Sequence, residues 1–218
     1  DQWIDRDDGD GRGTVEFIQE FARPLPQRVT ARVLGFPLED VDQLAAWGSA
    51  QVMQYVYGKG HLNQLSGEET ALQAQRLDGF ADYLADQVAR KRKNPQDDMI
   101  SALTQIRYTA LDRKLTDEEV YGIIYFMVLG GLETTQYALE EEAQLLCEQA
   151  GLFSAIKAIP DKIRAFTEEA MRLRAPTQGL STRVTTRDEV FQGVHLPAGS
   201  VLHIRFGAGN VDPRQYAC

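Results

Sequence analysis

Two adjacent glycines, Gly130 and Gly131, lie inside the longest apolar run of the chain, which begins at Ile123. Thr-Asp-Glu-Glu at 116–119 is a capping box that predicts a helix beginning before this run, and the next strong helix stop is Gly151. Each interior glycine costs a helix about 1 kcal/mol relative to alanine, so this helix loses about 2 kcal/mol at one point. We therefore expect the glycines to serve a close contact with another group.

Two polar residues follow the glycines. The Thr134 hydroxyl can bond to a carbonyl of its own helix or turn to a ligand. Glu133 is a carboxylate in an apolar stretch, which is costly unless it is paired, solvated or used. A carboxylate beside a hydroxyl at a bendable helix suits proton delivery through water. Two interpretations stay open: a flat ligand lies against bare backbone, or the glycines admit a neighbouring helix while Thr134 bonds its own backbone.

Charge and composition exclude several classes of partner. The net charge of -9 and the pI of about 4.9 argue against binding to nucleic acid or to an anionic membrane. The basic cluster at 90–93 ends a predicted helix, where cations offset the helix dipole. The longest apolar run is too short to cross a bilayer, and the acidic N-terminal stretch is unlike a secretory signal. We expect a cytoplasmic protein without a membrane or nucleic-acid partner.

The cysteines and histidines show no metal-ligand spacing. Cys147 and Cys218 form neither a zinc motif nor a disulfide framework. The three histidines are isolated from one another in the sequence. We therefore predict no metal site built from these side chains.

The hydrophobic pattern predicts a mostly α fold with a small β region. Pro24, Pro26 and Pro37 are expected to be helix boundaries. The helix from 116 to 151 should be apolar on every face in its middle and cross the whole domain. The other expected elements are a helix from the capping box at 66–69 to about 93, short helices at 99–106 and 161–173, and strands at 182–190, 190–196 and 201–204 around a turn at 197–199.

A second group of candidates lies in the last quarter of the chain. Glu169 and Arg172 are three residues apart on a predicted helix, so they can form a charge-assisted pair. Arg183 begins the first predicted strand, where a guanidinium can contact a carboxylate through two hydrogen bonds. Taken singly, an exposed helical pair and a surface arginine are the commoner interpretations.

Taken in order and spacing, the motifs resemble those of the soluble bacterial cytochrome P450 family, over essentially the whole chain. The segments that carry the resemblance are Gly-Gly-Leu-Glu-Thr-Thr at 130–135, Glu-Ala-Met-Arg at 169–172, Arg183, Thr-Arg-Asp at 186–188, Gly-Val at 193–194, Pro-Ala-Gly at 197–199 and Asn-Val-Asp-Pro at 210–213.

The resemblance implies a haem-thiolate monooxygenase that uses haem b, dioxygen and electrons from an external ferredoxin-type or flavodoxin-type donor to hydroxylate a small organic substrate. It places the Gly130 and Gly131 helix over the distal face of the haem, with Glu133 and Thr134 delivering protons. Gly130, Gly131, Thr134 and Arg183 would contact the cofactor, Arg183 through a propionate. Glu169 and Arg172 would form a buried structural pair.

The chain also departs from the family pattern. Family members are much longer, and the Phe-x-x-Gly-x-x-x-Cys-x-Gly loop that supplies the thiolate is absent, so Cys147 and Cys218 are interpreted as incidental. We expect one partial domain over residues 1–218, an internal fragment that is inactive alone. Apolar residues at 125–132 and Leu180 fit a small apolar or aromatic substrate. The alternative is a non-catalytic helical interaction module, or a degenerate relative without haem.

Overall fold

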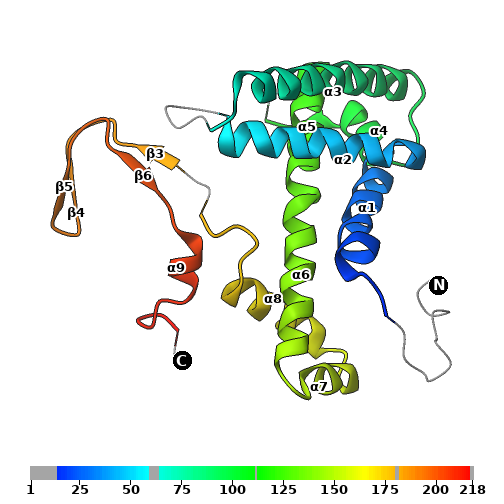
Figure 1. The fold of residues 1–218 in the computed structure, drawn as a ribbon. Coiled ribbons are helices and arrows are strands. Elements are labelled where there is room, and N and C mark those ends of the chain that lie inside the picture. The colour runs from blue at the N-terminus through cyan, green and yellow to red at the C-terminus, as the bar shows by residue number, and fades with distance from the viewer. Residues whose placement is uncertain (1–13, 59–63, 111, 180–181, 217–218) are drawn as a thin grey trace. The chain divides into compact units, whose positions relative to one another are not determined.

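A computed structural model describes residues 14–58, 64–110, 112–179 and 182–216 (Figure 1). Contacts within the chain form two compact units, the first ending at Gln136 and the second beginning at Tyr137. The assignment of residues 1–218 to one partial domain stays a prediction.

Unit 1 is helical apart from one short antiparallel ladder, β1 with β2. Its elements are the π-helix η1 (Ile18–Ala22), α1 (Pro24–Leu34), the 3₁₀ turn η2 (Leu38–Asp40), α2 (Val41–Val52), the π-helix η3 (Met53–Tyr57), α3 (Gly67–Lys93), α4 (Met99–Gln105), β1 (Arg107–Tyr108), β2 (Arg113–Lys114), α5 (Asp117–Gly131) and the first turn of α6 (Glu133–Glu148).

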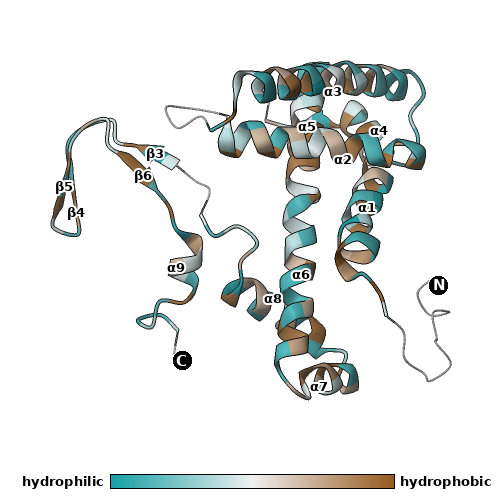
Figure 2. Ribbon diagram, in the orientation of Figure 1, coloured by the Kyte–Doolittle hydropathy of each residue, from teal (hydrophilic) through white to brown (hydrophobic). Residues whose placement is uncertain are grey.

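The core of unit 1 lies where α2, α3 and α5 pack together, with α1 and α4 beside them (Figure 1). Trp47 of α2 stacks on Phe80 of α3 with ring centroids 5.1 Å apart, and its ring lies 4.9 Å from that of Tyr83. Burying each large apolar side chain stabilises the fold by roughly 1.5–3 kcal/mol. In Figure 2, α3 carries both brown and teal turns, as expected for a helix with one apolar face.

Both predicted capping boxes are confirmed. The Ser66 hydroxyl accepts from Glu69 N–H at 3.1 Å, and the Glu69 carboxylate accepts from Ser66 N–H at 2.8 Å. Thr116 and Glu119 make the same reciprocal pair at 3.3 and 2.9 Å. These bonds satisfy N–H groups that have no partner within the helix, which fixes where α3 and α5 begin.

The prolines begin elements rather than cut them. Pro24 and Pro26 lie in the first turn of α1, where a missing N–H costs little. Pro37 directly precedes η2. They are therefore helix boundaries, as the sequence predicts.

The expected single helix from 116 to 151 is interrupted, which corrects the sequence-based prediction. Leu132 lies outside the helical region with φ -97° and ψ -81°, so α5 ends before it and α6 begins after it. The sequence also predicts that the middle of this helix is apolar on every face and crosses the core, but only one face of α5 is buried. Val120, Ile124 and Val128 are buried, whereas Ile123 and Phe126 on the other side are 37% and 72% exposed.

Unit 2 contains most of α6 and the smaller elements that follow it in the sequence. They are α7 (Leu152–Ala158), α8 (Lys162–Leu173), β3 (Thr182–Val184), β4 (Glu189–Phe191), β5 (Val194–Leu196), β6 (Val201–His203) and α9 (Phe206–Asn210). Leu145 and Ala170 are its buried apolar residues in the described chain. An ion pair between Arg174 and Glu148 joins α6 to the end of α8.

The strands of unit 2 differ from those expected, in which 190–196 is one strand followed by a turn at 197–199 and a strand at 201–204. The run at 190–196 is divided by a turn at Gln192 and Gly193, whose φ values are 53° and 81°, so β4 pairs with β5. The turn at 197–199 is present, but β6 pairs with β3 rather than with β5. Paired left-handed residues give a hairpin turn whose twist matches that of the strands, and Gly193 supplies one of them without strain.

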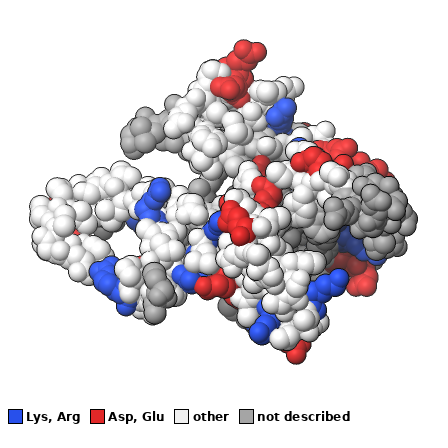
Figure 3. Space-filling view, turned by 60° about the horizontal axis from the view of Figure 1, so that its bottom comes forward, with Lys and Arg blue, Asp and Glu red and all other residues white. Residues whose placement is uncertain are grey.

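The fold class is confirmed as mostly α with a small β region, and the described residues contain no helix long and apolar enough to cross a bilayer. On the described part of the face drawn in Figure 3, Lys and Arg side chains are scattered among Asp and Glu. They do not form one continuous basic surface there.

Candidate functional site

The candidate site surrounds the break between α5 and α6. Leu132 lies outside the helical conformation, and its carbonyl accepts the first backbone bond of α6, from Gln136 N–H at 3.1 Å. In an unbroken helix the Gly130 carbonyl would accept from the N–H of Thr134. In this structure it accepts from the Thr134 hydroxyl at 2.6 Å. A threonine side chain thus holds the helix at the point where the glycines weaken it.

The two glycines have different surroundings. A Cβ on Gly131 would lie 2.8 Å from Thr30 Oγ1 of α1, and the Thr30 hydroxyl donates to Gly131 O at 3.3 Å. A Cβ on Gly130 would meet no atom within 4 Å. The neighbouring-helix interpretation holds for Gly131, and Thr134 bonds to its own backbone as that interpretation expects, whereas a ligand lying against Gly130 stays a prediction. Gly131 admits a neighbouring helix, and Gly130 presents bare backbone to open space.

An apolar strip continues the Gly130 face along α5. Gly122, Ile123 and Phe126 precede Gly130 at spacings of three and four residues, which places them on one side of the helix. Phe126 is 72% exposed, and Gly122, like Gly130, has nothing within 4 Å of its Cβ position. Exposed apolar side chains grouped on one side of a helix make this strip a candidate binding surface.

Glu133 faces a different neighbour, helix α2. Burial raises the pKa of its carboxyl, while a hydrogen bond with the Ser49 side chain and the charge of Arg23 act in the opposite direction. Gly48 makes this approach of α2 possible, because a Cβ there would lie 2.6 Å from Leu132 Cδ1. Glu133 is thus a partly buried acid that retains its proton to a higher pH than an exposed glutamate.

The sequence did not single out Ser49, Gly48 or Thr30, which bring α1 and α2 against the break. Gly48 sits inside a helical pattern, and an interior glycine of this kind signals close packing. That signal could have identified α2 as the neighbour. Nothing in the sequence pairs Ser49 with Glu133, because the two residues meet only through tertiary packing.

In unit 2, Glu169 and Arg172 form an ion pair on α8, with oxygen-to-nitrogen distances of 2.5 and 2.8 Å. Arg172 also donates to Asn210 O at 2.7 Å, and its guanidinium lies 4.7 Å from the centroid of the Tyr216 ring. The pair is not buried in this structure, contrary to expectation, because the Glu169 side chain is 55% exposed. Hydrogen bonding to Arg172 lowers the pKa of Glu169.

Arg183 lies in β3 opposite Leu202 of β6, and its guanidinium donates to Thr182 O at 2.9 Å. It belongs to unit 2, whereas Gly130, Glu133 and Thr134 belong to unit 1. Leu180, expected in a substrate pocket, lies outside the described residues.

The residues at the break have the properties that one side of a flat macrocycle would need. Gly130 leaves room for a planar edge, Phe126 and Ile123 provide an apolar surround, and the Thr134 hydroxyl lies one turn beyond. A thiolate ligand to iron is not found among the described residues at this face. Cys147 is exposed near the end of α6, Cys218 lies outside the description, and the described residues contain no cluster of three metal-ligating side chains.

Comparisons with known proteins agree on one kind of relative. The chain is 29% identical over 203 residues to the biotin biosynthesis cytochrome P450 of Bacillus subtilis, covering 93% of the chain and 49% of the relative. It is 31% identical over 206 residues to the cyclomarin C epoxidase CymV of Salinispora arenicola, covering 94% and 50%. The chain therefore spans about half the length of the curated relatives it matches. No family model matches the chain.

Solved structures give the same result. Ligand-free cytochrome P450 TbtJ1 superposes with a TM-score of 0.81 at 28% identity, covering 92% of this chain and 51% of that one. P450BioI, solved in complex with an acyl carrier protein carrying hexadec-9Z-enoic acid, also gives 0.81 at 27% identity, covering 93% and 50%. These values show similarity in both sequence and fold.

Proposed function

Because the homologues of this chain are bacterial cytochrome P450s, we propose that it forms part of a haem-dependent monooxygenase that oxidises a small organic molecule. The observation that carries the proposal is the open Gly130 face at a helix break held by the Thr134 hydroxyl. An ordinary structural helix gains nothing from exposing an apolar strip that includes two uncrowded glycines, Gly122 and Gly130. A helix that forms one wall of a cofactor and substrate cavity needs both.

Gly130 would give close access to the macrocycle, and Thr134 and Glu133 would lie beside its oxygen-binding side. When bound, haem supplies the oxidising power that inserts an oxygen atom into a substrate C–H bond. The Thr134 hydroxyl donates to Gly130 O in the present structure, so its oxygen is free to accept a hydrogen bond from a water. It would thereby position a water at the break of the helix.

Glu133 would act as the proton source for that water. Its raised pKa keeps a larger fraction of the carboxyl protonated near neutral pH than an exposed glutamate would have. Ser49 holds the side chain on the α2 side of the break. Rotation of the carboxyl would then move a proton between this polar side and the open Gly130 side.

The residues of unit 2 would have structural and cofactor-holding roles. Arg183 would contact a propionate of the haem, since guanidinium and carboxylate match in charge and geometry. Glu169 and Arg172 would hold α8 to the segment around Asn210. The apolar strip on α5 favours an apolar or aromatic substrate, with electrons supplied by a ferredoxin-type or flavodoxin-type protein.

Thr134→Ala tests the proton-delivery role in a haem-loaded protein that contains this segment. We expect substrate binding to persist while electrons are diverted to hydrogen peroxide, so that product formed per electron pair falls by about tenfold or more. Thr135→Ala is the matched control, because Thr135 is the adjacent, exposed threonine. Equal coupling in the two variants would exclude the role proposed for Thr134.

The 218-residue chain alone would not show the carbon monoxide difference spectrum of a thiolate-ligated haem, because its cysteines lack a supporting loop. Adding haem and carbon monoxide to the purified, reduced chain measures this directly. A thiolate-type band from that sample would overturn the proposal that the chain is inactive alone. Sequencing the coding DNA on both sides would separate a monooxygenase from a non-catalytic helical module.

A further inference from the structure

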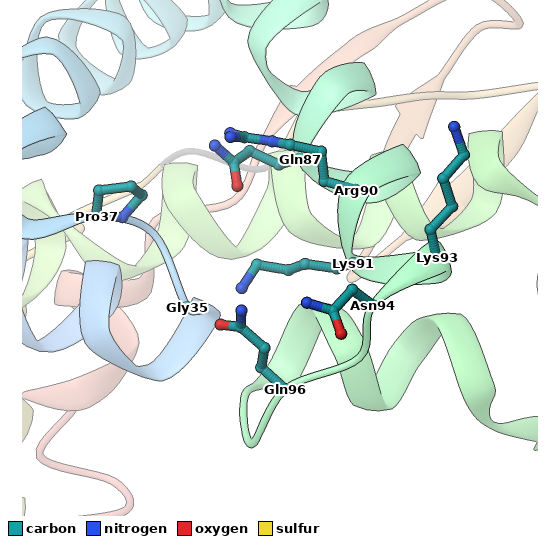
Figure 4. A pocket seen from close by; sticks show the side chains of 8 residues that line it. All are labelled: Gly35, Pro37, Gln87, Arg90, Lys91, Lys93, Asn94 and Gln96. Atoms are coloured by element: carbon teal, nitrogen blue, oxygen red, sulfur yellow. The ribbon is translucent and has the colours of Figure 1, made fainter.

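A cavity of about 420 Å³ lies at the C-terminal end of α3, within unit 1. The turn after α1 forms one wall, and the last two turns of α3 with the segment that follows form the other (Figure 4). The lining residues are Gly35, Pro37, Gln87, Arg90, Lys91, Lys93, Asn94 and Gln96.

The cavity is lined by three cations and by no carboxylate. Lys91 is paired with Asp98, and both side chains are more than nine-tenths buried. Arg90 pairs at 2.9 Å with Asp86, but both of these side chains are 61% exposed, so water and competing anions screen the contact. No carboxylate in the described parts of the chain pairs with Lys93. The charges of Arg90 and Lys93 are therefore available to a ligand.

Gln87 supplies the second observation. Its side chain is 3% exposed, and Nε2 has no hydrogen-bond acceptor among the described residues. A buried amide without a partner destabilises the fold, and native structures contain few such groups. Figure 4 shows the Gln87 amide beside the Arg90 side chain at one edge of the cavity, while Lys91 extends toward Gly35. The orphan donor thus lies on the same cavity as the cations.

We propose that this cavity binds an anionic group, a carboxylate or a phosphate, with Gln87, Arg90 and Lys93 as its donors. Pro37 and the aliphatic stem of Lys91 supply apolar contact for the rest of the ligand. Compensation of the helix dipole explains basic residues at the end of α3 but not a buried amide without an acceptor beside them. The site is separate from the Gly130 face and requires no haem.

The probes are inorganic phosphate and acetate. Each is titrated into the isotope-labelled 218-residue chain at constant ionic strength, and NMR follows the resonances of the Gln87 side-chain amide. We expect millimolar binding that shifts these resonances, and Lys93→Gln should weaken it about tenfold. Arg164→Gln is the control, because that 90% exposed arginine lies in α8. Binding of phosphate alone or acetate alone identifies the ligand class. Binding of neither, or equal weakening in the control, overturns the proposal.

Gln87→Leu gives an independent readout. Removing the orphan amide should raise the melting temperature of the ligand-free chain, because a leucine leaves no unsatisfied donor. The same substitution should abolish the increase in melting temperature that the bound probe gives the parent chain. If the leucine variant is stabilised by the probe as much as the parent chain, the amide does not contact the anion and the proposed site is wrong.

Discussion

Substituting alanine for each of the two glycines in turn should have opposite effects on stability. At Gly130 the added methyl meets no atom within 4 Å, and the backbone there is not left-handed. Gly130→Ala should therefore raise the free energy of unfolding by about 0.5–1 kcal/mol, the difference in helix propensity. At Gly131 the methyl would lie 2.8 Å from Thr30 Oγ1 and 3.5 Å from its Cγ2.

Gly131→Ala forces the Thr30 hydroxyl to move. The bond from this hydroxyl to Gly131 O contributes about 1 kcal/mol, so its loss cancels the gain in helix propensity. Residual crowding then makes the variant less stable than the parent by up to about 2 kcal/mol. The difference between the two alanine variants should be at least about 1 kcal/mol.

Thr30→Ala removes both crowding atoms and supplies the matched background. In that background Gly131→Ala should stabilise the chain about as much as Gly130→Ala does, which gives a coupling energy of about 1–2 kcal/mol between residues 30 and 131. Urea unfolding followed by tryptophan fluorescence and circular dichroism measures all five proteins, namely the parent, the three single variants and the double variant. If Gly131→Ala is as stable as Gly130→Ala while Thr30 is intact, the packing account of Gly131 is refuted.

Three further predictions follow from charged and polar groups. Asp98→Asn should lower the free energy of unfolding by about 3–5 kcal/mol, because it leaves the buried Lys91 ammonium unpaired; urea titration measures the change. The double variant Lys91→Met with Asp98→Asn should recover much of the loss. Burial would raise the pKa of Asp98, but hydrogen bonds from Lys91 and Ser101 hold it below its usual value, so this stabilisation should be lost as the pH falls through the folded pKa. Because burial raises the folded pKa of Glu133, its contribution to stability is greatest below the unfolded pKa and declines as the pH rises through the folded pKa. Glu133→Gln should abolish that decline when the free energy of unfolding is measured from pH 4 to 8. A variant with the same pH profile as the parent would contradict this prediction.

The sequence predicted the features that depend on local chemistry. The capping boxes at Ser66 and Thr116 fixed two helix starts, and the fold class followed from the periodicity of the apolar residues. The glycine pair and its neighbouring acid and hydroxyl marked the helix that now shows a break. Each of these signals lies within a few residues of the structure it specifies.

The sequence could not predict features decided by tertiary contact. The roles of Gly130 and Gly131 differ only because Thr30 packs against one of them. The partial burial of Glu133 depends on α2, and the pairing of β6 with β3 depends on a hairpin that separates β4 from β5. The exposed side of α5 escaped the sequence argument as well, because apolar residues on all sides of a helix normally indicate burial on all sides.

The infrared C–O stretching frequency of carbon monoxide bound to the haem of a protein containing this segment tests the central claim most directly. The frequency responds to side chains at the distal side of the macrocycle, and Gly130→Ala would place a methyl there. Gly67→Ala is the control, because Gly67 is equally uncrowded and begins α3 rather than lying on this face of α5. We predict that the frequency shifts in Gly130→Ala and in Thr134→Ala but stays close to the parent value in Gly67→Ala. An unchanged frequency in both the Gly130 and Thr134 variants would show that this face does not meet the haem.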